Sequence, residues 1–226
     1  MAKKRKVFLH VGLEAGPDNV IEAALFEHRH ALESLGVRVA PENADEMFRA
    51  AIEITRTHKA WGYKRREVEG AWAGICRRIL KAKGTHDYVL SQPLLAGAAP
   101  EQIDLLVDQL PGLAVHVVVV APAGNDAMLE GVLDRWARAV RKPERLHVVE
   151  VAADQGKQHV WRELGRVVGF GTASLSVAGL GEQPLTSLTD ALDQVARLRR
   201  RNQTLELKLS EAEKKRKRLR RRQTAA

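Results

Sequence analysis

The chain has 226 residues, of which 45% are hydrophobic, and a formal net charge of +9. This length and apolar content predict one domain of average size with a well-buried core, together with an appendage. The absence of a run of about 18 apolar residues excludes a transmembrane helix, and the short apolar run after the basic N-terminus matches a signal peptide poorly. The single cysteine, Cys76, excludes an internal disulfide framework and a cysteine-based zinc site. We therefore expect a cytoplasmic protein.

The charge is unevenly distributed along the chain. Residues 3–6 are all basic, and residues 197–226 contain 13 Lys or Arg against three Glu. Residues 7–196 contain 20 basic and 25 acidic side chains. The body is therefore mildly acidic, and the net positive charge belongs to the two ends.

Short apolar runs alternate with amphipathic stretches along the body. In chain order, the patterns predict a strand at 7–12, a helix at 19–35, a strand at 37–39, two helical pieces within 44–83 that are separated near Trp61, a strand at 87–91, a helix at 100–110, a strand at 115–121, a helix at 127–142, a strand at 145–152 and a helix at 160–168. This alternation favours a parallel sheet with helices on both faces. We therefore predict an α/β fold with a five-stranded, mostly parallel, doubly wound sheet, followed by a long basic helix that forms a coiled coil.

The composition changes after the body. Residues 169–187 are rich in Gly, Ser and Thr, which predicts a linker. The expected organisation is therefore a basic N-terminal tail at 1–6, an α/β domain at 7–168, a linker at 169–187 and a coiled-coil helix with a basic C-terminus at 188–226.

Apolar residues after the predicted linker repeat at heptad spacing. With Val195 at position a, the a and d positions are Val195, Leu198, Asn202, Leu205, Leu209 and Ala212. Asn202 at an a position within a Leu-rich seam is typical of two-stranded coiled coils, where such an Asn fixes the register. We expect a homodimer through residues 188–219, and the alternative is a single helix that folds back on the body.

The end of the expected coiled coil carries eight basic residues in nine positions, namely Lys214, Lys215, Arg216, Lys217, Arg218, Arg220, Arg221 and Arg222. A cluster of this density can contact several phosphates of a nucleic acid or another polyanion. Aromatic residues do not interleave it, so base stacking is not expected and binding would be non-specific. A solvated helix end without a partner is the alternative, and purely electrostatic attachment to a membrane surface fits less well.

Five short segments of the body occur in the same order as in one known family. They are 7–13 (V-F-L-H-V-G-L), 58–62 (H-K-A-W-G), 68–72 (V-E-G-A-W), 89–95 (V-L-S-Q, then L-L) and 115–119 (V-H-V-V-V). In this order the segments resemble the actinobacterial-type sulfotransferase-like proteins of the P-loop fold. The resemblance implies the P-loop sulfotransferase fold, the sulfuryl donor PAPS and sulfuryl transfer.

The donor loop of that family follows the first strand and reads P-K-T-G-T-T, and its backbone N–H groups hold the phosphosulfate of PAPS. The aligned positions here are Glu14, Ala15, Gly16, Pro17, Asp18 and Asn19. Ala15 replaces the lysine, Pro17 removes a backbone N–H, and two carboxylates stand where phosphates would bind. Repulsion between like charges would cost about 1–4 kcal/mol per contact. This loop is therefore not expected to bind PAPS.

Two further positions depart from the family. After the fourth strand the family has Arg-Asp, whose Arg holds the nucleotide 3′-phosphate, and Pro122 stands at that position here. After the third strand the family has S-H-E or S-Q-E, and this chain has Ser91-Gln92-Pro93. Because three sites have lost their chemistry while the core patterns persist, the resemblance implies a catalytically inactive member.

We therefore expect a binding or scaffold protein that self-associates through its coiled coil and binds anions at its basic end. No catalytic residue, cofactor or metal is assigned, and the protein or ligand that the body binds is not identified. One alternative is an active PAPS-dependent sulfotransferase with an altered donor site. A second alternative is a protein that binds nucleic acid non-specifically through residues 197–226.

Histidine, cysteine and tryptophan residues of the body allow both structural and functional interpretations. His10, His116 and His147 lie in or beside predicted strands and would form a metal site or a pH-sensitive group if they converge, although hydrogen-bonded structural roles are commoner. Cys76 shares an apolar helix face with Trp72 and is expected to be a buried, unreactive thiol. The tryptophans are expected to be core or half-buried residues rather than ligand-stacking ones; they are Trp61, Trp72, Trp136 and Trp161.

Overall fold

A computed structural model of the protein describes residues 4–12, 20–124, 126–152 and 154–180. The predicted donor loop from Glu14 to Asn19 lies outside these ranges. The predicted coiled coil at 188–226 also lies outside them, with its a and d residues from Val195 to Ala212 and its basic end from Lys214 to Arg222.

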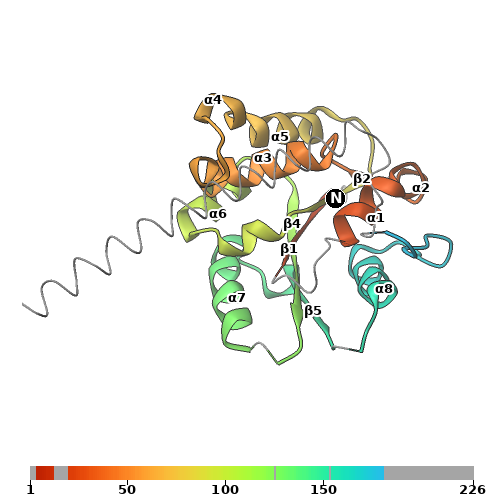
Figure 1. Ribbon diagram of the computed structural model, residues 1–226. Helices are drawn as coiled ribbons and strands as arrows, with labels where there is room; N and C mark the ends of the chain where they lie inside the picture. The colour runs from red at the N-terminus through yellow and green to blue at the C-terminus, as the bar shows by residue number, and fades with distance from the viewer. Residues whose placement is uncertain (1–3, 13–19, 125, 153, 181–226) are drawn as a thin grey trace, which may run out of the picture.

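Five strands form one sheet in the order β2-β3-β1-β4-β5, and every neighbouring pair is parallel (Figure 1). The strands are β1 (Lys6–Gly12), β2 (Val37–Val39), β3 (Asp87–Ser91), β4 (Ala114–Pro122) and β5 (Leu146–Val151). The predicted α/β fold is therefore confirmed, and the sheet is parallel throughout.

The helices alternate with the strands along the chain. They are α1 (Val20–Glu27), α2 (Arg29–Ser34), α3 (Ala44–Ile54), α4 (Arg65–Val68), α5 (Ala71–Lys81), α6 (Pro100–Asp108), α7 (Asp126–Val140) and α8 (Lys157–Val168), with short 3-10 helices η1 (His58–Trp61), η2 (Pro93–Gly97) and η3 (Pro143–Arg145). The helix predicted at 19–35 is divided in two at His28, and the 44–83 region contains three helices and η1 rather than two pieces.

Local sequence accounts for several helix ends. Asn43 caps α3, because its side-chain oxygen accepts a hydrogen bond from the backbone N–H of Glu46 at 2.8 Å. Pro100 occupies the first position of α6, where a missing N–H removes no helical hydrogen bond. Gly169 ends α8 in the left-handed region at φ 97°, a conformation that favours glycine.

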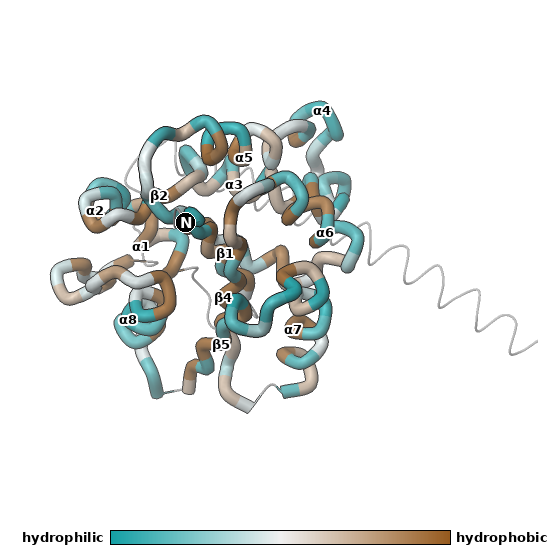
Figure 2. Tube along the Cα trace, turned by 180° about the vertical axis from the view of Figure 1, so that it is seen from behind, coloured by the Kyte–Doolittle hydropathy of each residue, from teal (hydrophilic) through white to brown (hydrophobic). Residues whose placement is uncertain are grey.

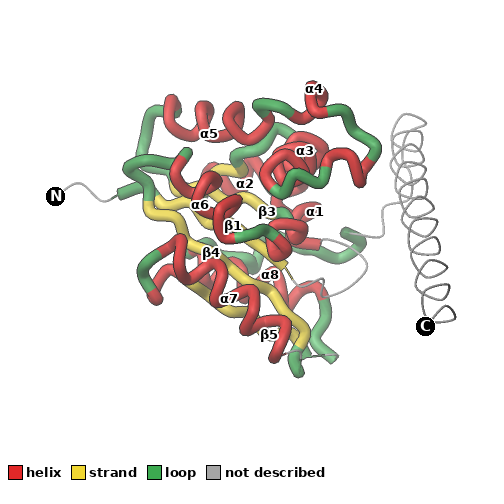
Figure 3. Tube along the Cα trace, turned by 90° about the vertical axis from the view of Figure 1, so that its left-hand side faces the viewer, coloured by secondary structure: helices red, strands yellow, loops and turns green. Residues whose placement is uncertain are grey.

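Helices cover both faces of the sheet, so it is doubly wound (Figures 1 and 3). Helices α3, α5, α6 and α7 pack on one face and α1, α2 and α8 on the other. Successive residues of β1 serve both layers, since Val7, Leu9 and Val11 join the first core and Phe8 joins the second. Figure 2 shows the strands inside as mostly hydrophobic and the surrounding helices as mixtures of hydrophobic and hydrophilic residues.

The central strand β1 lies where the connections diverge. The chain leaves β1 for α1 on one face, whereas it leaves β3 and β4 for helices on the opposite face. In parallel α/β sheets, the carboxyl edge at such a switch point is the usual ligand site. A ligand site is therefore expected at the carboxyl ends of β1, β3 and β4.

The packed body extends beyond Val168, into the predicted linker at 169–187. Phe170, Leu175 and Val177 are buried in the second core. The ring of Phe170 lies 5.2 Å from the ring of Trp161, and Nε2 of His28 is hydrogen-bonded to the carbonyl of Ser176 at 2.8 Å. These contacts hold residues 170–177 against α8 and the junction of α1 and α2, so this part of the predicted linker belongs to the fold.

Gly165 is the point of closest approach between α8 and this segment. A Cβ placed on Gly165 would lie 2.5 Å from Thr172 Cγ2 and 2.9 Å from the carbonyl oxygen of Phe170. We therefore expect Gly165→Ala to lower the free energy of unfolding by about 1–3 kcal/mol through overpacking. Urea unfolding measures this change.

Gly131 provides the matched control, because it lies inside α7 and a Cβ there meets only the flexible end of Arg135 at 3.6 Å. We expect Gly131→Ala to stabilise the protein by up to about 1 kcal/mol, through helix propensity and a more restricted unfolded chain. Equal effects of the two substitutions would contradict the close contact at Gly165.

Candidate functional site

Three polar side chains are buried at the carboxyl edge of the sheet, on β1, on β3 and directly after β3. They are His10, Ser91 and Gln92. His10 and Ser91 are directly opposite each other in the parallel register, and His10 Nδ1 lies 2.8 Å from Ser91 Oγ. The backbone N–H of Gln92 donates to the carbonyl of His10 at 3.0 Å. These contacts fix the two strand ends together and place a polar cluster at the switch point.

The imidazole of His10 is neutral at physiological pH. Its complete burial lowers its pKa to about 3, because desolvation penalises the charged ring. Hydrogen bonding with Ser91 occupies Nδ1, and the tautomer decides which atom donates. Among the described residues, Nε2 has no hydrogen-bond partner.

Gly12 leaves space beside the second ring nitrogen of His10. A Cβ on Gly12 would lie 3.3 Å from Nε2 of His10 and 3.4 Å from Cβ of Pro93. Any other residue at this position would therefore crowd the imidazole at the exit of β1. Within the described part of the chain, Nε2 is thus a neutral ring nitrogen without a partner, and it can act as a donor or an acceptor.

The described strand ends carry no positive charge. The last residue of each strand and the described residues directly after it include no lysine or arginine. Pro122 is the last residue of β4, so the described structure has no guanidinium at the position where the resembled family holds the 3′-phosphate. The described strand ends at the switch point are thus polar and carry no cation.

Two of the three histidines that could have converged do so, at the opposite end of the sheet. Nδ1 of His116 lies 3.0 Å from Nε2 of His147, with the rings 5.3 Å apart and inclined by 13°. His10 belongs to the separate cluster with Ser91. Among the described residues no group of three or more His, Cys, Asp or Glu side chains has the arrangement of a metal site.

The environment of this histidine pair keeps it uncharged. Burial lowers the pKa of His116 to about 4, with smaller contributions from His147, Lys6 and Arg145, and the carboxylate of Asp87 opposes them. Burial and Lys6 also lower the pKa of His147. Since one ring must donate and the other accept, the 3.0 Å distance requires that at least one ring is neutral.

Stability is therefore expected to fall with pH below about 6.5, the ordinary histidine pKa. There the unfolded chain takes up protons that the folded His116 and His10 do not bind until about pH 4 and about pH 3. The measurement is urea unfolding at about pH 7.5 and about pH 4.5 for the wild type and for His116→Gln. We expect the smaller loss in the variant, and an equal loss in both would contradict a neutral His116.

Cys76 and the tryptophans are placed largely as predicted. Cys76 is buried, as predicted, and burial raises its pKa to about 12, which disfavours the reactive thiolate. Trp72, Trp136 and Trp161 are fully buried core residues, whereas Trp61 is partly exposed.

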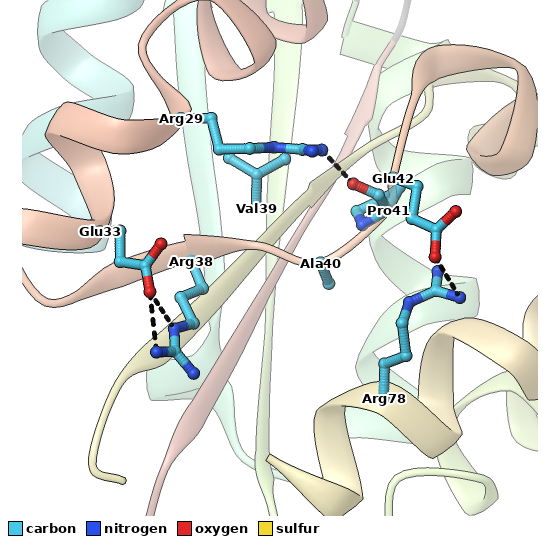
Figure 4. A pocket seen from close by; sticks show the side chains of 8 residues that line it. All are labelled: Arg29, Glu33, Arg38, Val39, Ala40, Pro41, Glu42 and Arg78. Atoms are coloured by element: carbon cyan, nitrogen blue, oxygen red, sulfur yellow. Dashed lines mark hydrogen bonds and ion pairs between the residues drawn. The ribbon is translucent and has the colours of Figure 1, made fainter. Parts of the chain in front are cut away.

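A hollow of about 210 Å³ lies beside the edge strand β2 (Figure 4). Its charged groups are largely paired with one another, since Arg38 donates to Glu33, Arg78 contacts Glu42 at 3.4 Å and Arg29 donates to the carbonyl of Pro41. An anion would have to displace these partners, so the hollow is best explained as a network of surface ion pairs. Its lining consists of Arg29, Glu33, Arg38, Val39, Ala40, Pro41, Glu42 and Arg78.

The sequence alone does not predict the His10–Ser91 pair. It marks each residue separately, one as a candidate metal ligand and one in a family motif. Their contact depends on β3 lying next to β1 with Ser91 opposite His10, and the sequence does not state that register. The available signal is a polar residue near the carboxyl end of each of two apolar strands, since strand ends of a parallel sheet share one edge.

No family model matches this chain, and no curated protein or solved structure is significantly similar to it. The resemblance to sulfotransferase-like proteins therefore rests on the sequence motifs alone. None of the helices in the described ranges combines the length and the apolar composition needed to cross a bilayer.

Proposed function

We propose that this protein is a catalytically inactive, sulfotransferase-like binding module. The observation that carries the proposal is the neutral polar cluster of His10, Ser91 and Gln92 at a switch point whose described strand ends lack any cation. The fold provides the usual ligand position of an α/β sheet, and the residues at that position favour recognition by hydrogen bonds.

Electrostatics argue against PAPS as a ligand. Its phosphosulfate and 3′-phosphate carry several negative charges, which proteins usually neutralise with Lys, Arg or a metal ion. His10 does not supply a charge, because its pKa is about 3. The sequence that follows Gly12 adds Glu14 and Asp18 but no basic residue before the start of α1.

The His10–Ser91 pair also lacks what nucleophilic catalysis requires. A histidine that activates a serine is normally oriented by a carboxylate and has a pKa near the working pH. The one described partner of the His10 ring is Ser91 itself, and the pKa of His10 lies far below neutrality. The pair therefore supports a binding role for the site rather than acyl or sulfuryl transfer.

Calorimetric titration of the full chain with PAPS and with its desulfated product PAP tests the proposal. The titration is run at low salt and again at about 0.5 M salt, where screening suppresses binding by exposed basic residues. We expect no saturable one-site binding at high salt. Binding that persists there and is weakened in Ser91→Ala would instead support the active sulfotransferase with an altered donor site.

The proposal includes self-association through residues 188–219 and anion binding at residues 214–222. Both rest on the heptad spacing and charge of the sequence, because these residues lie outside the described ranges. Pairing of two chains would place two basic clusters together and raise their avidity for a polyanion without new contacts. The same cluster is the basis of the alternative in which the protein binds nucleic acid non-specifically through residues 197–226 and the body takes no part in binding.

Replacing Asn202 tests the expected dimer. A buried Asn at position a favours two strands, so Asn202→Leu is expected to shift the chain to higher oligomers. Light scattering coupled to size-exclusion chromatography measures the mass. Gln203→Leu is the matched control, because the neighbouring position lies outside the seam and should leave the dimer unchanged. A monomeric wild type would refute the proposed interface.

A further inference from the structure

The segment between α3 and α4 is strongly basic and contains no acid. Residues 55–66 read T-R-T-H-K-A-W-G-Y-K-R-R and include five Lys or Arg, while the body as a whole is acidic. The segment contains η1 and lies at the periphery of the molecule beside α4 (Figure 1). Such local charge on an acidic body is not explained by the fold.

Two aromatic rings of this segment gather on α3. The ring of Trp61 meets that of Phe48 edge-on with centroids 5.1 Å apart, and the ring of Tyr63 lies 6.1 Å from Phe48. Gly62 separates Trp61 and Tyr63 in the left-handed region at φ 75°, where glycine is favoured. All three residues are partly exposed. Contact with Phe48 therefore holds the rings of Trp61 and Tyr63 in place while part of each remains accessible to solvent.

The nearby carboxylates are occupied elsewhere. Glu67 accepts from the backbone N–H of Lys64 at 2.6 Å, and Glu53 accepts from the backbone N–H groups of Gly70 and Trp72. Glu69 contacts Arg65 at 3.5 Å. Four exposed cations therefore have no ion pair among the described residues; they are Arg56, Lys59, Lys64 and Arg66.

We propose that Trp61 and Tyr63, with Arg56, Lys59, Lys64 and Arg66 around them, form an aromatic-basic surface that binds single-stranded nucleic acid. Lys and Arg side chains contact the phosphates, and the accessible parts of the two rings stack on unpaired bases. The combination favours this ligand over a duplex, whose bases are already stacked, and over an acidic protein, which needs the cations alone.

This surface differs in chemistry from the basic C-terminal cluster. The cluster at 214–222 has cations but no aromatic residue, so it does not distinguish single strands from duplexes. The aromatic-basic surface has both groups and lies on the folded body. A preference for single strands is therefore the property that separates the two regions.

Tryptophan fluorescence of the full chain gives a direct test, because Trp72, Trp136 and Trp161 are buried and Trp61 is the partly exposed one. A short oligothymidylate is titrated at moderate salt, and a duplex of equal length is titrated in parallel. We expect the single strand to quench Trp61 and to bind more tightly. Variants at Trp61 lack the reporting ring, so their affinities are measured by the anisotropy of a fluorescein-labelled strand and duplex. Trp61→Ala should weaken single-strand binding at least about fivefold and leave duplex binding unchanged.

Two further variants separate folding from recognition. Trp61→Phe keeps a stacking ring and should retain the preference for single strands if Trp61→Ala abolishes it by removing the stack. Lys59→Ala/Lys64→Ala should reduce the slope of log K against log salt by about 0.7 for each phosphate that the variant no longer neutralises. The matched control is Lys81→Ala/Lys83→Ala, which removes two exposed lysines at the end of α5.

Several outcomes would overturn the proposal. One is equal binding of single strand and duplex, and another is a failure of Trp61→Ala to bind either of them. Displacement of the bound oligonucleotide by polyglutamate as effective as displacement by free oligothymidylate, at the same charge concentration, would assign the surface to acidic proteins instead.

Discussion

The parallel pairing of β1 with β3 on one side and β4 on the other governs the structure. It buries β1 on both faces, so each of its side chains must fit one of two packed layers. A polar residue in such a strand is tolerated only with a hydrogen-bond partner, and Ser91 provides it for His10. The pairing of β1 with β3, which holds the sheet together, therefore also brings together the polar residues of the switch point.

The buried histidines lie at opposite edges of the sheet but share a lowered pKa. His10 lies at the carboxyl edge of the sheet, while His116 and His147 lie near its amino edge, and desolvation keeps all three largely uncharged. A neutral imidazole is a directional partner rather than a source of charge. The body thus concentrates positive charge on its periphery, as in the segment between α3 and α4, and excludes it from the described strand ends.

Most of the fold followed from apolar patterning, and the site did not. The five strands were predictable because runs such as 117–120 are apolar at every position, as a doubly covered parallel strand requires. The packed segment around Phe170 and Val177 was not, because its Gly, Ser and Thr content hides a few well-placed apolar residues. The ring contacts and partial exposure of Trp61, on which its proposed role rests, were also hidden, because they are properties of the tertiary structure. Pairing of His10 with Ser91 required a register that no local pattern encodes.

The close packing at Gly165 and Phe170 bears on where the foldable unit ends. A boundary at Val168, where the last helix stops, would strip the cover from Trp161 and remove the carbonyl partner of His28. The smallest part of this chain that keeps its core covered thus includes the segment through Val177, although that segment has no regular secondary structure. Exchange of C-terminal extensions between related proteins would preserve the body only if the junction fell after this point.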